Sequence, residues 1–134
     1  GVDGAARGGG VELALACDLR VATPEATLAE TGVRLGLFGA WGGTTRLPRV
    51  VGESAAMDLA LSGRPVDAEA ALRMGLVSRV TSEPRAVADE LAGVDHAALR
   101  ALKARLRDDT DQRTGDERER AAFATLVDAA EFDS

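Results

Sequence analysis

The spacing of apolar residues predicts short helices and strands that alternate up to about residue 80. Residues 9–17 are apolar on nearly every side, as expected of a buried helix. Apolar runs short enough for strands occur at 19–22, 26–29 and 76–80. Helical patterns occur at 44–51, 53–61 and 68–74. Together these elements predict a mixed α/β fold.

Turn and cap residues divide these elements. Pro24 predicts a turn between the first two strands. Gly63 and Gly75 stand where two of the helices should stop, and Asp67 stands where the second of them should be capped. The glycine-rich stretch 30–43 predicts an irregular segment.

The second part of the chain has a different pattern. Three helices are predicted at 85–91, 96–106 and 116–132, and the last two carry charge on one face and Leu, Val and Phe on the other. The change of pattern falls at 82–84, so we expect two modules, 1–82 and 83–134. Exposed apolar faces on such helices often contact another subunit, so oligomerisation is the expected role of the second module.

Composition excludes several classes of protein. The 134 residues carry 16 basic and 22 acidic side chains, a net charge of −6, so no basic nucleic-acid surface is expected. The chain lacks the roughly 18 consecutive uncharged apolar residues of a membrane span. Its single cysteine excludes an internal disulfide and favours the cytoplasm. Because Gly1 leads at once into a glycine run, we expect a piece of a longer protein.

The first candidate site is the glycine run at 8–10, followed by Glu12. Glycines let a ligand approach the backbone, and the free N–H groups of a helix start favour negative charge. Donors aimed at a carbonyl oxygen form an oxyanion hole, and Glu12 on the first turn could act as acid or base. The alternative is a tight helix contact, with Glu12 stabilising only the helix dipole.

The second candidate is the loop 36–43, whose side chains could line a substrate pocket. Its candidate binding residues are Phe38, Gly39, Ala40 and Trp41. The alternative is a structural turn with Trp41 packed in the core. No lysine follows these glycines, so a phosphate-binding P-loop is excluded.

The remaining residues with reactive or charged side chains give weaker indications of a functional site. Cys17 is expected in the core, and His96 is expected to be a solvated helix residue rather than a zinc ligand. The charge run 107–120 is expected to be a solvated face. Asp18 could orient Arg20. No metal site and no cofactor are predicted.

Taken together, the ordered motifs resemble the crotonase superfamily, the enoyl-CoA hydratase/isomerase family. The resemblance rests on VDGAARGGGVELALACD at 2–18 and GGTTRLPRVVG at 42–52. It continues at 33–36, 60–64, 67–70 and 75–80. It implies part of a crotonase ββα-spiral core followed by a helical trimerisation region, in a fragment that lacks the family's N-terminal half.

The resemblance also implies roles for particular residues. Acyl-CoA thioesters would be the substrates, and coenzyme A would enter as part of them. Gly9 would donate one of two N–H groups to the thioester oxyanion, between Gly8 and Gly10, and the second donor would belong to the N-terminal half. Glu12 matches the first of two catalytic glutamates. Gly32 stands where the hydratases have the second.

Because glycine stands at position 32, the resemblance does not determine which reaction the protein catalyses. Glu30 lies two residues earlier, and whether it can take over the second carboxylate's part is undecided at this stage. The leading hypothesis is hydration of a 2-enoyl-CoA in fatty acid β-oxidation, by a homotrimer or dimer of trimers, with this chain inactive by itself. The alternatives are an acyl-CoA-binding protein without hydratase activity and a helical module that serves assembly alone.

Overall fold

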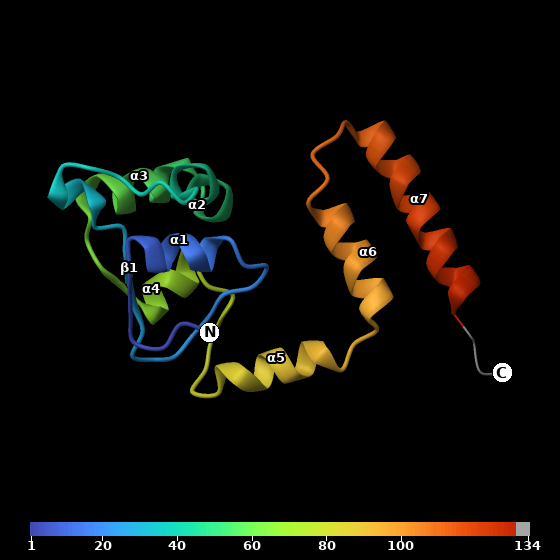
Figure 1. The fold of residues 1–134 in the computed structure, drawn as a ribbon, viewed down its shortest axis with the longest axis horizontal. Coiled ribbons are helices and arrows are strands. Elements are labelled where there is room, and N and C mark those ends of the chain that lie inside the picture. Colours follow the sequence, from blue (N-terminus) through green and yellow to red (C-terminus); the bar gives the residue numbers. More distant parts are fainter. Residues whose placement is uncertain (131–134) are drawn as a thin grey trace. The chain divides into compact units, whose positions relative to one another are not determined.

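The computed structural model describes residues 1–130, and the chain divides into two compact units, residues 1–88 and 89–134 (Figure 1). The division falls after Ala88, inside helix α5 (Pro84–Ala92), whereas the sequence pattern changes at 82–84. In residues 1–130 no helix is long and apolar enough to cross a membrane.

Two small sheets form the first unit's β structure. Strand β1 (Ala5–Arg7) pairs parallel with β3 (Thr27–Ala29), which pairs antiparallel with β4 (Val66–Asp67). Strand β2 (Val21–Ala22) pairs parallel with β5 (Arg79–Val80). The sequence pattern did not predict β1 or β4, because three and two residues are too short to show an alternation.

The predicted strand at 76–80 is shorter than expected. Only residues 79–80 pair as β5. Leu76 and Val77 are instead part of the turn that follows helix α4 (Ala68–Arg73), where the Leu76 N–H donates to Ala71 O at 2.8 Å. Both side chains are 1% exposed, so the apolar run reflects burial in the core rather than a strand.

Helices pack against the strands, and both supply residues of the core. The helices are α1 (Gly9–Leu15), α2 (Gly43–Val51), α3 (Glu53–Ser62) and α4. Val11 and Leu28 are among the largest fully buried side chains. Asp67 caps α4 through the Ala70 N–H, and Gly63 ends α3 in the left-handed conformation, as predicted.

The first helix differs from its prediction. It ends at Leu15, and Leu13 is 66% exposed, so α1 is buried on one face only. Cys17 follows the helix and is exposed, which corrects the expectation that it belongs to the core. Apolar composition alone could not show which face α1 turns to its neighbours.

Two helices that run in opposite directions dominate the second unit (Figure 1). Helix α6 (His96–Leu106) is capped by Asp95, and α7 (Gln112–Ala129) by Asp111. The last residues of the helix predicted at 116–132 lie outside the described part of the chain. His96 is exposed, as predicted.

The charge run 107–120 is largely exposed, as predicted, and Asp108 within it makes specific contacts. Asp108 pairs with Arg105 at 2.8 Å and with Arg118 at 3.0 Å, and it accepts the Thr110 N–H. Hydrogen bonds from Thr110 and, after them, the Arg118 guanidinium hold the pKa of the Asp108 carboxyl well below its usual range. The segment therefore connects α6 and α7 through one shared carboxylate.

Candidate active site

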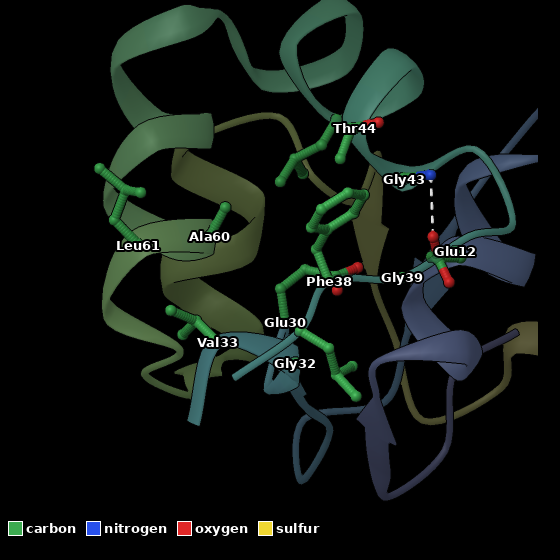
Figure 2. Close-up of a pocket in the computed structure, with 12 residues that line it drawn as sticks. Glu12, Glu30, Gly32, Val33, Phe38, Gly39, Gly43, Thr44, Ala60 and Leu61 are labelled. Carbon is green, nitrogen blue, oxygen red and sulfur yellow. Dashed lines mark hydrogen bonds between the residues drawn. The ribbon is translucent and has the colours of Figure 1, made fainter. Parts of the chain in front are cut away.

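Glu12 is a buried carboxylate on the first turns of α1. The residue is 2% exposed, and its Oε1 accepts the backbone N–H groups of Trp41, at 3.1 Å, and Gly43, at 3.0 Å. Figure 2 shows the bond from Gly43. Because both donors occupy Oε1, Oε2 is the oxygen left to take up or release a proton.

Glycines 39 and 43 allow the loop to close around this carboxylate. A Cβ on Gly39 would collide with the Glu12 carboxyl group, and a Cβ on Gly43 would lie 2.8 Å from Glu12 Oε1. Gly42 between the loop and α2 has a φ of 93°, which an L side chain rarely adopts. The side chains of this loop are predicted to line a substrate pocket, and its backbone also positions Glu12.

The glycine run at the start of α1 contacts the same loop through Trp41. Gly8 has a φ of 46°, and Gly9 begins the helix. The Gly9 N–H belongs to the first turn, so no carbonyl of its own helix accepts it. A Cβ on Gly9 would lie 2.7 Å from the Trp41 ring. Trp41 therefore covers Gly9, and because it is 68% exposed it is not a core residue.

A largely apolar cavity of about 300 Å³ lies beside Glu12 (Figure 2). Five of the predicted site residues line it: Glu12, Glu30, Gly32, Phe38 and Gly39. Leu37 and Gly43, which belong to the loop 36–43 predicted to line a pocket, line it as well, and five further residues were not predicted: Val33, Thr44, Leu47, Ala60 and Leu61. They come from the 3₁₀ helix η1 (Gly32–Leu35), the loop that follows it, and helices α2 and α3. Val33, Leu47, Ala60 and Leu61 are apolar, so the sequence does not distinguish them from core residues, and only the fold shows that they face a cavity.

The other predicted site residues lie elsewhere. Gly10 lines a second cavity, of about 340 Å³, together with Leu13 and Cys17. In the described part of the chain, Gly8, Gly9, Ala40 and Trp41 are not part of the wall of the first cavity. Gly9 and Trp41 still belong to its surroundings, because one packs on the other and Trp41 bonds to Glu12.

Gly32 is required by the backbone that surrounds it. A Cβ at this position would lie 2.9 Å from Leu37 O and 3.0 Å from Phe38 Cα. The segment after η1 therefore packs directly against residue 32, where a longer side chain would need room. With this backbone, residue 32 cannot carry a carboxylate.

Glu30 supplies the cavity's second carboxyl group. Its Oε1 is buried and has no hydrogen-bond partner among residues 1–130. Burial raises the pKa of Glu30 to about 7, and the negative charge of Glu12 adds to this effect. The site thus combines one carboxylate anchored by the backbone with one carboxyl group that exchanges its proton near neutral pH.

Residues 1–130 contain no group of three or more His, Cys, Asp and Glu side chains placed to hold a metal ion.

Comparison with known proteins connects this geometry to one family. The sequence model described as enoyl-CoA hydratase/isomerase matches residues 1–132. A Mycobacterium leprae protein named as a probable enoyl-CoA hydratase is 43% identical over 108 residues, which cover 76% of this chain and 42% of that protein. The (E)-benzylidenesuccinyl-CoA hydratase of Thauera aromatica is 47% identical over 88 residues, 66% of this chain and 34% of that enzyme.

Solved structures agree with the sequence comparison. An enoyl-CoA hydratase subunit from Geobacillus kaustophilus has a TM-score of 0.86 at 36% identity, covering 96% of this chain and 52% of that one. The enoyl-CoA hydratase of Bacillus anthracis has a TM-score of 0.85 at 34% identity, covering 92% and 51%. The chain thus spans about half the length of the solved structures it matches.

Proposed function

Because the chain belongs to the enoyl-CoA hydratase/isomerase family, we propose that its cavity receives the acyl part of a CoA thioester and that the site adds water to a 2-enoyl-CoA. One observation carries the proposal: the buried Glu12 carboxylate, fixed by two backbone N–H groups, lies on the wall of an apolar cavity beside a helix start. The curated relatives named as hydratases favour this reaction over thioester binding alone.

The helix start supplies the electrostatic part of the mechanism. When water adds to C3 of the substrate, negative charge grows on the thioester oxygen. The Gly9 N–H, with the positive end of the α1 dipole behind it, would stabilise that charge. We expect the family's second donor to come from the part of the relatives' length that this chain does not span.

Glu12 supplies the proton transfer. Its Oε1 is engaged by Trp41 and Gly43, so Oε2 takes the proton of the attacking water while the water oxygen bonds to C3. C2 then gains a proton and the thioester carbonyl is restored. The apolar wall, including Phe38 and Leu61, excludes other water from the reacting carbons.

Crotonyl-CoA tests the proposal. We would follow the loss of the enoyl thioester absorbance with the complete gene product, its Glu12→Gln variant, and a Glu25→Gln control at an exposed turn. Glu12→Gln should lower kcat by about 10²–10⁴-fold, the usual contribution of one positioned acid or base, and Glu25→Gln should not. Binding without turnover in the wild type would contradict a hydratase and indicate a thioester-binding protein.

The same binding step has an independent readout. Trp41 is the chain's single tryptophan and packs on Gly9, so its fluorescence should change when a CoA thioester reaches the Gly9 N–H. We expect the 134-residue chain by itself to show no useful turnover, since one N–H donor is half of an oxyanion hole. Measurable crotonyl-CoA hydration by this chain would contradict that expectation.

Further proposals concern the whole protein. We propose that it assembles as a homotrimer or a dimer of trimers through the apolar faces of its second unit, and that it acts in the cytoplasm in fatty acid β-oxidation. The exposed apolar side chains of α6 and α7 support the assembly, and the family membership supports the pathway.

A further inference from the structure

We propose that Glu30 is the second proton-carrying group of this site and delivers the proton to C2 of the substrate. This inference rests on the proposed function. It assigns to Glu30 a proton transfer that Gly32 cannot perform, because glycine has no side chain.

The backbone places Glu30 beside the reacting groups. Glu30 directly follows strand β3, in which Leu28 is 1% exposed and faces the core. Since side chains alternate along a strand, residue 30 points to the same side as residue 28. The Gly8 N–H donates to Ala29 O at 2.9 Å, which ties the peptide before Glu30 to the residue before Gly9. The end of β3 and the start of α1 are thus held together.

The side chain faces the substrate cavity. Glu30 and Glu12 are the two titratable residues that line it (Figure 2). Glu30 also borders a small apolar cavity of about 10 Å³, whose other lining residues are all uncharged. Its Oε1 is buried without a hydrogen-bond partner in the described residues. Buried polar atoms are normally paired, so an unpaired oxygen on a cavity wall indicates a group that bonds to a ligand.

The electrostatic environment suits a proton donor. Burial is the larger cause that raises the pKa of Glu30 to about 7, and the negative charge of Glu12 is the smaller one. Near pH 7 the carboxyl group is therefore protonated about half of the time. Glu12 differs, because two N–H donors orient its Oε1. The two carboxyl groups can divide the work, one accepting a proton and the other giving one.

The resulting reaction is balanced. Water bonds through oxygen to C3, its proton passes to Glu12 Oε2, and the π electrons of the C2–C3 bond move into an enolate held by the Gly9 N–H. The enolate collapses as C2 takes the proton of the neutral Glu30. This leaves Glu12 protonated and Glu30 ionised, and a proton passes from Glu12 to Glu30 through solvent before the next turnover. One water is consumed.

The experiment compares Glu30→Gln and Glu30→Asp with wild type and the Glu25→Gln control, in the complete gene product with crotonyl-CoA. Glu30→Gln should lower kcat by about 10²-fold or more, with KM and the Trp41 fluorescence change on binding preserved. Glu30→Asp should recover part of the rate. The wild-type rate should fall as pH rises through about 7, where Glu30 loses its proton, and Glu30→Gln should lack that fall.

The outcomes separate the two proposals. If Glu30→Gln keeps the wild-type kcat and pH profile, the role of Glu30 is overturned while hydration through Glu12 stands. If the wild type does not hydrate the substrate, both proposals are overturned. Thermal melts of each variant show whether a lost rate comes from lost folding, and rescue by aspartate distinguishes proton transfer from a merely structural role.

Discussion

Glu30 should link the stability of the protein to pH. Its native pKa of about 7 lies above the ordinary glutamate value of 4.5, so between these values the folded state binds more protons than the unfolded state. Stability must therefore fall as pH rises through this window. Since solvent reaches part of the group, we expect a loss of about 1 kcal/mol rather than the full value of the shift.

Glu30→Gln should remove this loss. Its melting temperature should match the wild type at pH 5 and exceed it by several degrees at pH 8, because about 1 kcal/mol moves the midpoint of a small domain by roughly 4–8 °C. Calorimetry at a series of pH values measures the difference. A difference that stays constant from pH 5 to pH 8 would show that Glu30 is not the group responsible.

Gly43→Ala should displace Glu12. The new Cβ would lie 2.8 Å from Glu12 Oε1 and 2.9 Å from its Cγ, so either the side chain or the start of α2 must move. Overpacking of this kind costs about 1–3 kcal/mol, and hydration should fall with it because Oε2 loses its position. Urea unfolding and the crotonyl-CoA assay together test this, and unchanged stability and rate would contradict it.

The sequence shows the residues proposed to react more clearly than the groups that hold them. Glu12 and Gly9 are candidates because glycines before an acidic first turn are visible in the sequence. The donors to Glu12 are the backbone N–H groups of Trp41 and Gly43, which every residue but proline carries, so no residue type marks them. The direction of Glu30 depends on strand register, which one sequence does not show.

At the scale of elements, predictions succeeded where a local signal exists. Asp67 and Gly63 mark helix ends in the structure as they do in the sequence. Strands β1 and β4 were missed because three and two residues are too short to show an alternation, and their pairing, as of Ala6 with Leu28, joins distant parts of the chain. The family resemblance and the crotonase fold class are confirmed by the comparisons, since ordered motifs carry more information than periodicity.

Gly115→Ala should stabilise the protein, whereas Gly43→Ala should destabilise it. Gly115 lies in the first turns of α7, where its N–H donates to Asp111 O at 2.9 Å, and a Cβ there would meet nothing within 4 Å. Alanine loses less backbone entropy than glycine in a helix, so α7 should gain about 0.5–1 kcal/mol. Urea unfolding followed by circular dichroism checks the gain. A loss of helix stability would show that glycine is needed there.

At the scale of the whole molecule, the two units differ in what they bury. Unit 1 contains a core of buried apolar side chains such as Val11, Leu28 and Leu76, together with the cavity. In unit 2, none of the described residues of α6 and α7 is buried, although Leu102 and Phe123 are large and apolar. Such helices gain little hydrophobic stabilisation unless another surface covers them.

The proposed homotrimer supplies that surface, and Phe123→Asp should disrupt it. Phe123 is 67% exposed and lines an apolar groove of about 270 Å³ between α6 and α7, together with Leu102 and Leu126. A carboxylate there would have to be desolvated in an apolar contact, so the assembly should dissociate into monomers. Ala121→Asp is the matched control, since residue 121 is exposed on the same helix and outside the groove. Sedimentation equilibrium should give the mass of an assembly for the wild type and the control, and that of one chain for Phe123→Asp. If Phe123→Asp keeps the wild-type mass, the contact between copies lies on another face, and the groove has to be covered from within the protein.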